Sequence, residues 1–216
     1  MRHPSLARRG FEPGAQGRPR KTATMATAAA AVFLLAALIP SANACIEEGR
    51  QKAQVCGACH GADGNSPTPT VPSLAGQPRQ FLVTALFMYR EGRRKNPIMS
   101  PFADKLSNAD LNDLAAWYAS QKMAPPTRKA APDKVAQGKA LSEKNNCTAC
   151  HTPTLVGQQQ MPRLAGQHHD YLLDQLRQFR ATTRGDMDGT MTSAVQALTP
   201  ADIEVLAEYL STLAVP

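Results

Sequence analysis

Two cysteines spaced three apart and followed directly by a histidine occur twice in this chain. The first copy is CGACH at Cys56–His60, and the second is CTACH at Cys147–His151, 91 residues later. Two thiols about one helical turn apart can reach the two vinyl groups of one haem, and the histidine then faces its iron. The predicted attachment and ligand residues are Cys56, Cys59, Cys147 and Cys150 for the haems and His60 and His151 for the irons.

Three other kinds of site use the same residue types. A thioredoxin-like redox pair needs a strand–helix context, which the sequence pattern does not show. A zinc site could pool all six Cys and His side chains, but each motif comes with its own complete module. A structural disulfide would leave the repeated histidine unexplained. The pattern therefore favours two covalently attached haem c groups.

The sequence around each motif is also repeated. Pro72–Gln77 (PSLAGQ) recurs as Pro162–Gln167 (PRLAGQ), offset by 90 residues, and Met99 recurs as Met191, offset by 92. Offsets that drift by only one or two residues indicate duplication of one module with small loop insertions. In PRLAGQ, Arg163 replaces the serine of the first copy.

The duplication predicts two domains, residues 45–124 and 134–216. Residues 125–133 are rich in proline and polar side chains, so we expect a short, stiff linker there. Domains near 80 residues have small cores, and a large apolar cofactor in each would add to that core.

Apolar spacing and capping residues predict helices throughout and no convincing strand. Ser107 and Thr199, each followed three residues later by aspartate, offer helix N-caps in the two copies. The expected helices are Glu47–Val55, Gln80–Arg90 and one after Ser107, then Val135–Lys144, Asp170–Arg180 and one after Thr199. The fold class is therefore all-α.

Each copy also offers a second iron ligand. Met99 follows His60 by 39 residues and Met191 follows His151 by 40 residues, and both are expected in a loop before the last helix. A thioether is a soft, neutral ligand that stabilises ferrous iron and raises the reduction potential. We therefore predict Met99 and Met191 as the ligands opposite the histidines.

Other side chains compete for the second iron. Met187 is the strongest rival, but it breaks the register of the repeat by four residues. His168 and His169 align with non-ligating residues of the first copy, so a solvated loop is expected for them. Arg90 and Arg94 recur in the second copy. They are expected either at a solvated helix end or beside haem propionates.

The amino-terminal residues read as an export signal. A run of 14 apolar residues at 26–39 is too short to cross a bilayer comfortably, which takes about 20 residues. Basic residues precede it and Ala42-Asn43-Ala44 follows it, so a signal peptide at 1–44, cleaved after Ala44, is predicted. Cleavage makes Cys45 the first mature residue, either as a free N-terminal thiol or as a lipid attachment site, so membrane association would come from that lipid or from peripheral docking.

Most of the net positive charge of the chain lies in this amino-terminal segment. The whole sequence has a net charge of +7, but residues 45–216 hold 18 basic and 16 acidic side chains. Such a balance gives no reason to expect a nucleic-acid partner. Haem of this type is attached outside the cytoplasm, so the periplasm is the expected location.

The paired motifs, each followed by Pro-x-Leu-Ala-Gly-Gln, a methionine segment and a Leu-Ala-x-aromatic helix, resemble the dihaem cytochrome c4 family. The resemblance covers nearly all of residues 45–216. It implies two tandem class I cytochrome c domains packed about a pseudo-twofold axis, with His/Met ligation at both irons. It also implies that the carbonyls of Pro72 and Pro162 steady the histidine rings, and that Trp117 and Tyr209 pack on the first helix of their own domain.

An iron with six strong ligands has no position for a substrate, so electron transfer is expected rather than catalysis. The resemblance implies a carrier that links quinol oxidation, as by a quinol–cytochrome c reductase, to a terminal oxidase or a similar acceptor, and a dehydrogenase is the other expected donor. Two alternatives stay open. The chain could be the cytochrome subunit of a dehydrogenase complex, which needs an apolar docking face, or a dihaem peroxidase, which needs one iron with an open position.

Overall fold

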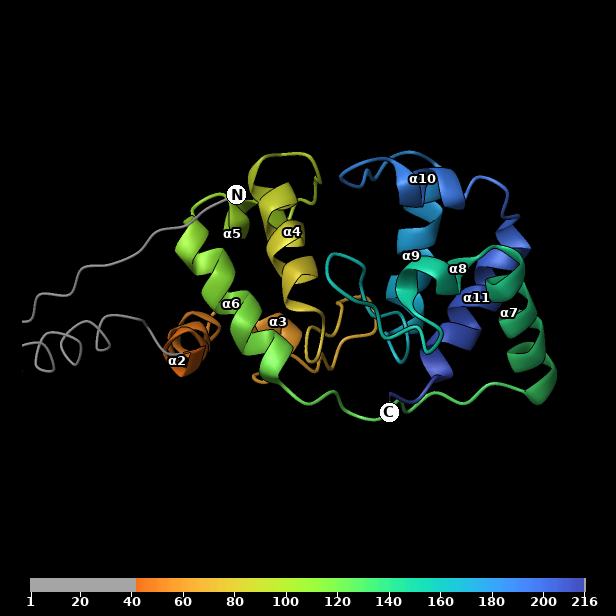
Figure 1. Ribbon diagram of the computed structural model, residues 1–216, viewed down its shortest axis with the longest axis horizontal. Helices are drawn as coiled ribbons and strands as arrows, with labels where there is room; N and C mark the ends of the chain where they lie inside the picture. Colours follow the sequence, from red (N-terminus) through yellow and green to blue (C-terminus); the bar gives the residue numbers. More distant parts are fainter. Residues whose placement is uncertain (1–41, 216) are drawn as a thin grey trace, which may run out of the picture. The chain divides into compact units, whose positions relative to one another are not determined.

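The described part of the chain, residues 42–215 of a computed structural model, consists of helices joined by loops (Figure 1). Within these residues the only β-type pairing is an isolated bridge between Gln158 and Met161. The helices are α2 (Ala42–Lys52), α3 (Gly57–His60), α4 (Arg79–Arg90), α5 (Met99–Ala103), α6 (Asn108–Ser120), α7 (Pro132–Lys144), α8 (Cys147–His151), α9 (His169–Arg180), α10 (Thr190–Ala194) and α11 (Pro200–Thr212). The all-α fold class is confirmed.

The same five helices occur twice in the same order. In the first half α6 packs against α2 and α4, and in the second half α11 packs against α7 and α9. Figure 1 shows the two halves with the same series of helices, α2 to α6 in one and α7 to α11 in the other. The duplication read from the sequence is therefore a duplication of structure.

The last helix of each half begins at a capping box. The Ser107 hydroxyl accepts a hydrogen bond from the Asp110 backbone N–H (3.2 Å), and the Asp110 carboxylate accepts one from the Ser107 N–H (2.8 Å). Thr199 and Asp202 make the same pair of bonds at 3.1 and 2.9 Å. These bonds satisfy amide groups that have no partner inside the helix, which fixes where α6 and α11 start.

The first and last helices of each half approach so closely that only glycine fits at the crossing. A Cβ at Gly49 would lie 2.8 Å from the Trp117 Cβ, and a Cβ at Gly138 would lie 2.2 Å from the Tyr209 Cβ. The two aromatic residues therefore pack on the first helix of their own half, as the family resemblance implies.

Each half buries its own apolar core. The last helix of each half buries an apolar stripe, Leu111, Leu114, Ala115 and Tyr118 in α6 and Ile203, Leu206, Ala207 and Leu210 in α11. In the second half Leu172, Leu176 and Phe179 of α9 complete the cluster. Leu82 of α4 has the corresponding place in the first half.

Residues 42–215 belong to one compact unit, and the domain limits predicted from the sequence stay predictions. None of the helices described in this range combines the length and apolarity needed to cross a membrane. The predicted signal peptide, with its apolar run, lies outside the described residues except for its last three.

Candidate haem centres

The first motif lies at a sharp turn between α2 and α4. Cys56 precedes α3 and is partly buried, Cys59 is exposed within α3, and His60 ends the helix with only 5% of its surface exposed. The Nδ1 atom of His60 lies 2.9 Å from the carbonyl oxygen of Pro72. A carbonyl only accepts, so Nδ1 carries the proton and Nε2 is left as a free lone-pair donor.

The second motif repeats this arrangement. Cys147 is partly buried, Cys150 is exposed, and His151 ends α8 with 6% of its surface exposed. Its Nδ1 donates to the carbonyl oxygen of Pro162 over 2.8 Å. The same tautomer is therefore fixed in both halves, with the unprotonated nitrogen available to a metal.

Burial sets the charge state of these groups. It lowers the pKa of His60 and of His151, which favours the neutral imidazole that binds iron. Burial also raises the pKa of the Cys56 and Cys147 thiols, whereas redox-active pairs have a lowered thiol pKa. Among the described residues none of the five cysteines forms a disulfide, and no three Cys, His, Asp or Glu side chains gather as a metal-binding group.

Both predicted methionine ligands lie in short helices, so the expectation that they lie in loops is wrong. Met99 is the first residue of α5 and Met191 the second of α10. The Asn96 side-chain oxygen accepts from the Met99 N–H over 2.8 Å, and the Asp186 carboxylate accepts from the Met191 N–H over 2.5 Å. These polar side chains start a helical turn that apolar periodicity does not reveal.

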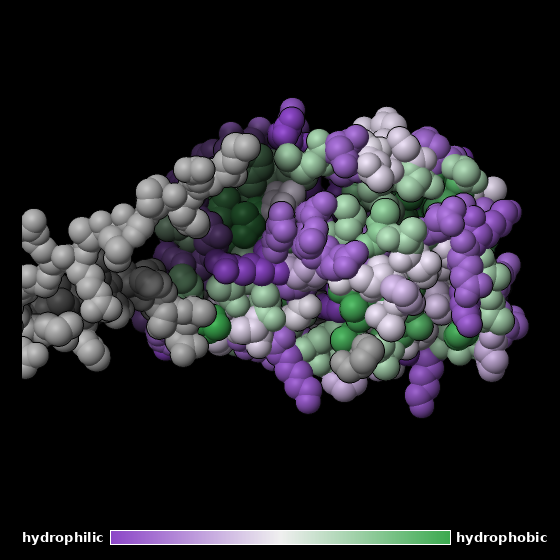
Figure 2. All heavy atoms as spheres, viewed as in Figure 1, coloured by the Kyte–Doolittle hydropathy of each residue, from purple (hydrophilic) through white to green (hydrophobic). Residues whose placement is uncertain are grey.

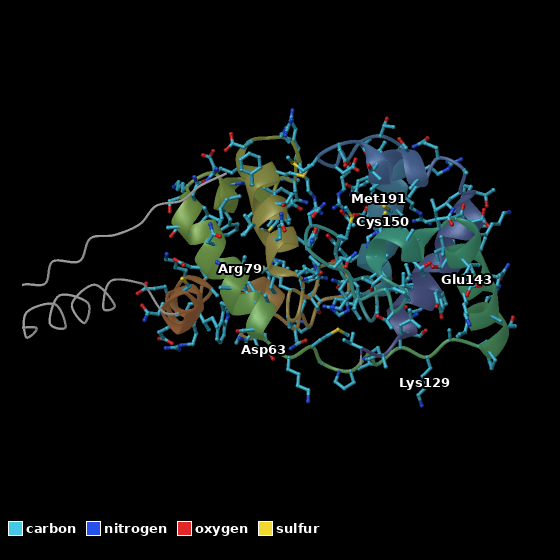
Figure 3. All side chains as sticks on the ribbon, in the orientation of Figure 1. Asp63, Arg79, Lys129, Glu143, Cys150 and Met191 are labelled. Atoms are coloured by element: carbon cyan, nitrogen blue, oxygen red, sulfur yellow. The ribbon has the colours of Figure 1, made fainter. Side chains whose placement is uncertain are left out.

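The structure separates Met191 from its rival Met187. Met191 is partly buried and packs against the core of the second half, as does Cys147. Figure 3 shows the Met191 side chain in the same region as Cys150 of the second motif. Met187 is 47% exposed, and the guanidinium of Arg93 lies 3.7 Å from its sulfur.

Partly buried apolar side chains pack against the same core as the first cysteine of each motif. They border the buried cores without being fully buried themselves. Figure 2 shows a hollow with strongly hydrophobic atoms over the region of α4, α5 and α6. In the first half they are Leu74, Phe81, Val83, Leu86 and Leu106, and in the second half Leu164 and Leu173. A haem would cover this surface, so the residues present fit that group.

Two guanidinium groups converge without a carboxylate. Arg94 and Arg184 both donate to the side-chain oxygen of Gln175, and each stacks on an aromatic ring, Tyr89 or Phe179. Neither forms an ion pair within the described residues, and the Nε of Arg184 is buried without a hydrogen-bond partner. Burial, and then the charge of Arg94, lower the pKa of Arg184 to about 10.

Arg94 is only 7% exposed, so of its two expected environments the solvated helix end is wrong. Arg94, which is buried, and Arg184, which is partly buried, form no ion pair within the described residues, so both fit the carboxylates of haem propionates. Arg90 has a different role, because it donates to the carbonyl of Leu106 over 3.0 Å. Its counterpart Arg180 donates to Leu198 over 2.7 Å. Both hold the segment that leads into the last helix.

The loops that hold the two histidines are bonded to each other by glutamines. Gln77 donates to the carbonyl of Arg163 (3.1 Å) and accepts from its N–H (2.9 Å). Gln167 donates to the carbonyl of Ser73 and accepts from its N–H, both at 2.9 Å. The sequence contained a signal for this contact, because both glutamines recur at one position of the repeat, but its role was missed.

His168 belongs to the same interface. Its Nε2 lies 2.9 Å from the carbonyl oxygen of Ser66, in the other half of the molecule. The expectation of a solvated loop is therefore wrong for this residue. His169 is also partly buried, beside the carboxylates of Asp170 and Glu208.

Comparisons with known proteins agree with this geometry. The Cytochrome c family model matches residues 46–122 and 135–214. Cytochrome c4 of Pseudomonas aeruginosa is 42% identical over 176 residues, covering 76% of this chain and 87% of that protein. The crystal structure of reduced cytochrome c4 from Pseudomonas stutzeri superposes with a TM-score of 0.72 at 37% identity, covering 78% of this chain and 98% of that one. A thiosulfate dehydrogenase electron acceptor from Thiomonas intermedia is 33% identical over 195 residues, 84% of this chain and 88% of that protein.

Proposed function

Because the chain belongs to the cytochrome c4 family of dihaem electron carriers, we propose that it shuttles electrons across the periplasm. Its donor is a quinol-oxidising complex or a dehydrogenase, and its acceptor is a terminal oxidase. The observation that carries the proposal is the paired geometry of His60 and His151, each buried and held by a proline carbonyl. One such centre accepts one electron, so the chain holds two.

We assign the haem-binding residues in the same order in both halves. Cys56 and Cys59 attach the first haem, and His60 and Met99 ligate its iron. The second haem is attached and ligated by Cys147, Cys150, His151 and Met191. A haem bound in this way supplies reversible one-electron chemistry between ferric and ferrous iron.

The protein contributes orientation and electronic tuning. The carbonyls of Pro72 and Pro162 fix the orientation of the two imidazole rings. Each carbonyl accepts a hydrogen bond from Nδ1, which makes Nε2 a stronger electron-pair donor to a metal. Arg94 and Arg184 supply positive charge for propionate carboxylates. If His60 and Met99 hold one iron and His151 and Met191 the other, neither iron would have room for peroxide, which disfavours the peroxidase alternative.

The bonds between Gln77, Gln167 and the opposite loops support transfer between the two centres. Four hydrogen bonds at 2.9–3.1 Å, all buried, join the loops that carry the histidine partners. A rigid connection of this kind keeps the two centres at a constant separation. Electrons can then pass within the chain without a domain movement.

A dehydrogenase donor has a specific observation in its favour. One relative covering 84% of the chain is named as the electron acceptor of thiosulfate dehydrogenase. We propose as a second candidate that this chain accepts electrons from a dehydrogenase that oxidises an inorganic sulfur compound.

The test compares donors directly. Oxidised holoprotein is mixed with membranes that contain quinol–cytochrome c reductase, or with a thiosulfate-oxidising dehydrogenase, and haem reduction is followed optically. We expect two electrons per chain from one donor class, and reoxidation by membranes that contain a terminal oxidase. Peroxide turnover with a high-spin haem would instead support the peroxidase. Stable co-purification with a dehydrogenase would identify a subunit rather than a free carrier.

The export prediction has its own test. Mass spectrometry of the mature protein will show whether the chain begins at Cys45, as cleavage after Ala44 predicts. A diacylglycerol mass on Cys45 would show a lipid anchor to the membrane. A chain that retains residues 1–44 would contradict the proposed signal peptide.

A further inference from the structure

Arg163 is a fully buried cation at the junction of the two halves. Its side chain is 2% exposed. One guanidinium nitrogen donates to the carbonyl of Ala165 in its own half (2.6 Å), and the other donates to Ala75 in the opposite half (2.9 Å). The guanidinium therefore bridges the two halves through neutral carbonyl oxygens.

No negative charge compensates this cation within the described residues. Arg163 takes part in none of their ion pairs, and its Nε is buried without a hydrogen-bond partner. Burial lowers its pKa to about 10, which still leaves it charged at neutral pH. Because a buried charge is poorly screened by water and salt, its field acts over a longer range than that of a surface arginine.

The guanidinium is connected to the histidine loops of both halves. Arg163 directly follows Pro162, whose carbonyl accepts from His151. Ala75 comes three residues after Pro72, whose carbonyl accepts from His60. The same charge is thus bonded into the loops that orient both proposed iron ligands.

The repeat explains why there is only one such arginine. Ser73 occupies the position equivalent to Arg163, and Ala75 is equivalent to Ala165. The Arg163 guanidinium already bonds both alanine carbonyls. An arginine at position 73 would need the same two oxygens and would place a second cation beside the first. One arginine therefore serves both halves.

We propose that Arg163 is a shared tuning residue that raises the reduction potentials of both haems. A ferric centre carries one more positive charge than a ferrous one, so a fixed cation nearby disfavours the oxidised state of each. The inference rests on the proposed ligation of the two irons by His60 and His151. It goes beyond that ligation because it assigns a redox role to a residue that touches no iron.

The test is an optical redox titration of dihaem holoprotein carrying Arg163→Met, Arg163→Gln or Arg163→Lys. Methionine and glutamine remove the charge, and glutamine keeps hydrogen-bond donors. Lysine keeps a positive charge below its own pKa, which burial lowers, so the titration is run at about pH 6. Arg79→Met, at an exposed arginine, is the matched control. We expect the neutral variants to shift the reduction equilibrium of both haems roughly three- to tenfold towards the oxidised form, where tenfold is 59 mV for one electron. Lysine and the control should keep both midpoints near wild type.

The outcomes separate a charge effect from a packing effect. If both neutral variants keep wild-type midpoints, or shift only one haem, the shared tuning role is wrong. If lysine shifts the midpoints as far as glutamine does, geometry and not charge is responsible, and the proposal also fails. Should Arg163→Met not fold, the comparison of glutamine with lysine decides alone. Haem content and low-spin spectra, recorded on the same samples, test the ligation independently.

Discussion

Replacing Gln167 by alanine will weaken the junction between the two halves and lower the free energy of unfolding, although only one side chain is shortened. Gln167 is 3% exposed, and its amide makes both hydrogen bonds to the backbone of Ser73. Ser73 is itself buried, so after the change its N–H and C=O have no partner in the protein. An unsatisfied buried group costs about 1–3 kcal/mol, so two such groups cost about 2–6 kcal/mol of unfolding free energy.

The assay is equilibrium unfolding of holoprotein by urea, followed by far-ultraviolet circular dichroism. Gln77→Ala, which removes the equivalent bonds to Arg163, should lose a similar amount. The double variant should lose less than the sum, because both glutamines hold one interface and opening it once releases both. Gln137→Ala, at an exposed position on α7, is the control and should change stability by less than about 0.5 kcal/mol.

Gln167→Glu separates the two bonds. Glutamate keeps an oxygen that accepts from the Ser73 N–H but loses the amide donor to the Ser73 carbonyl, and it also buries a charge. A loss below about 1 kcal/mol for both Gln167→Ala and Gln77→Ala would refute the reasoning. The two halves would then be held together by something other than these four bonds.

Three further changes test other parts of the account. Met191→Ala should lower the midpoint of the second haem and open its iron to added ligands, whereas Met187→Ala should leave the optical spectrum unchanged; the reverse result would make Met187 the ligand. Gly138→Ala places a methyl group 2.2 Å from the side chain of the facing helix and should cost about 1–3 kcal/mol or more by urea unfolding; a neutral result would mean that the helices separate easily. The ion pair with Lys52, 2.8 Å away, and the Ser107 cap lower the pKa of Asp110 from 3.8 to about 2, so its stabilising effect is complete above pH 4 and disappears as the pH falls through 2. The melting temperature should therefore fall more steeply between pH 4 and pH 2 for wild type than for Asp110→Asn. Equal slopes would contradict the lowered pKa of Asp110.

Local chemistry made much of the fold predictable. Ser107 and Thr199 fixed the starts of the last helices, because a capping box depends only on residues three apart. Apolar spacing identified the long helices, because it too depends only on residues a few positions apart in the sequence. The short helices at Met99 and Met191 were missed, because their first turns depend on the side chains of Asn96 and Asp186 rather than on a pattern of apolar residues.

Contacts between the halves were the part that sequence alone did not supply. From the sequence, Arg90 and Arg94 could lie at a solvated helix end or beside propionates, and the choice depends on residues of the other half. Arg94 is buried because Gln175 and Tyr171 of the other half receive its guanidinium. The same limit applied to His168, whose partner Ser66 lies 102 residues away. The internal repeat identifies which residues are equivalent in the two halves. Which of them are in contact is visible only in the structure.

Whether histidine and methionine close both irons can be measured by an optical redox titration of the purified dihaem protein, with carbon monoxide added to the fully reduced sample. We expect each chain to take up two electrons, in one-electron steps at two low-spin haems, and carbon monoxide to bind to neither iron. Uptake of a single electron, or a reduced haem that binds carbon monoxide readily, would contradict the claim that histidine and methionine close both irons.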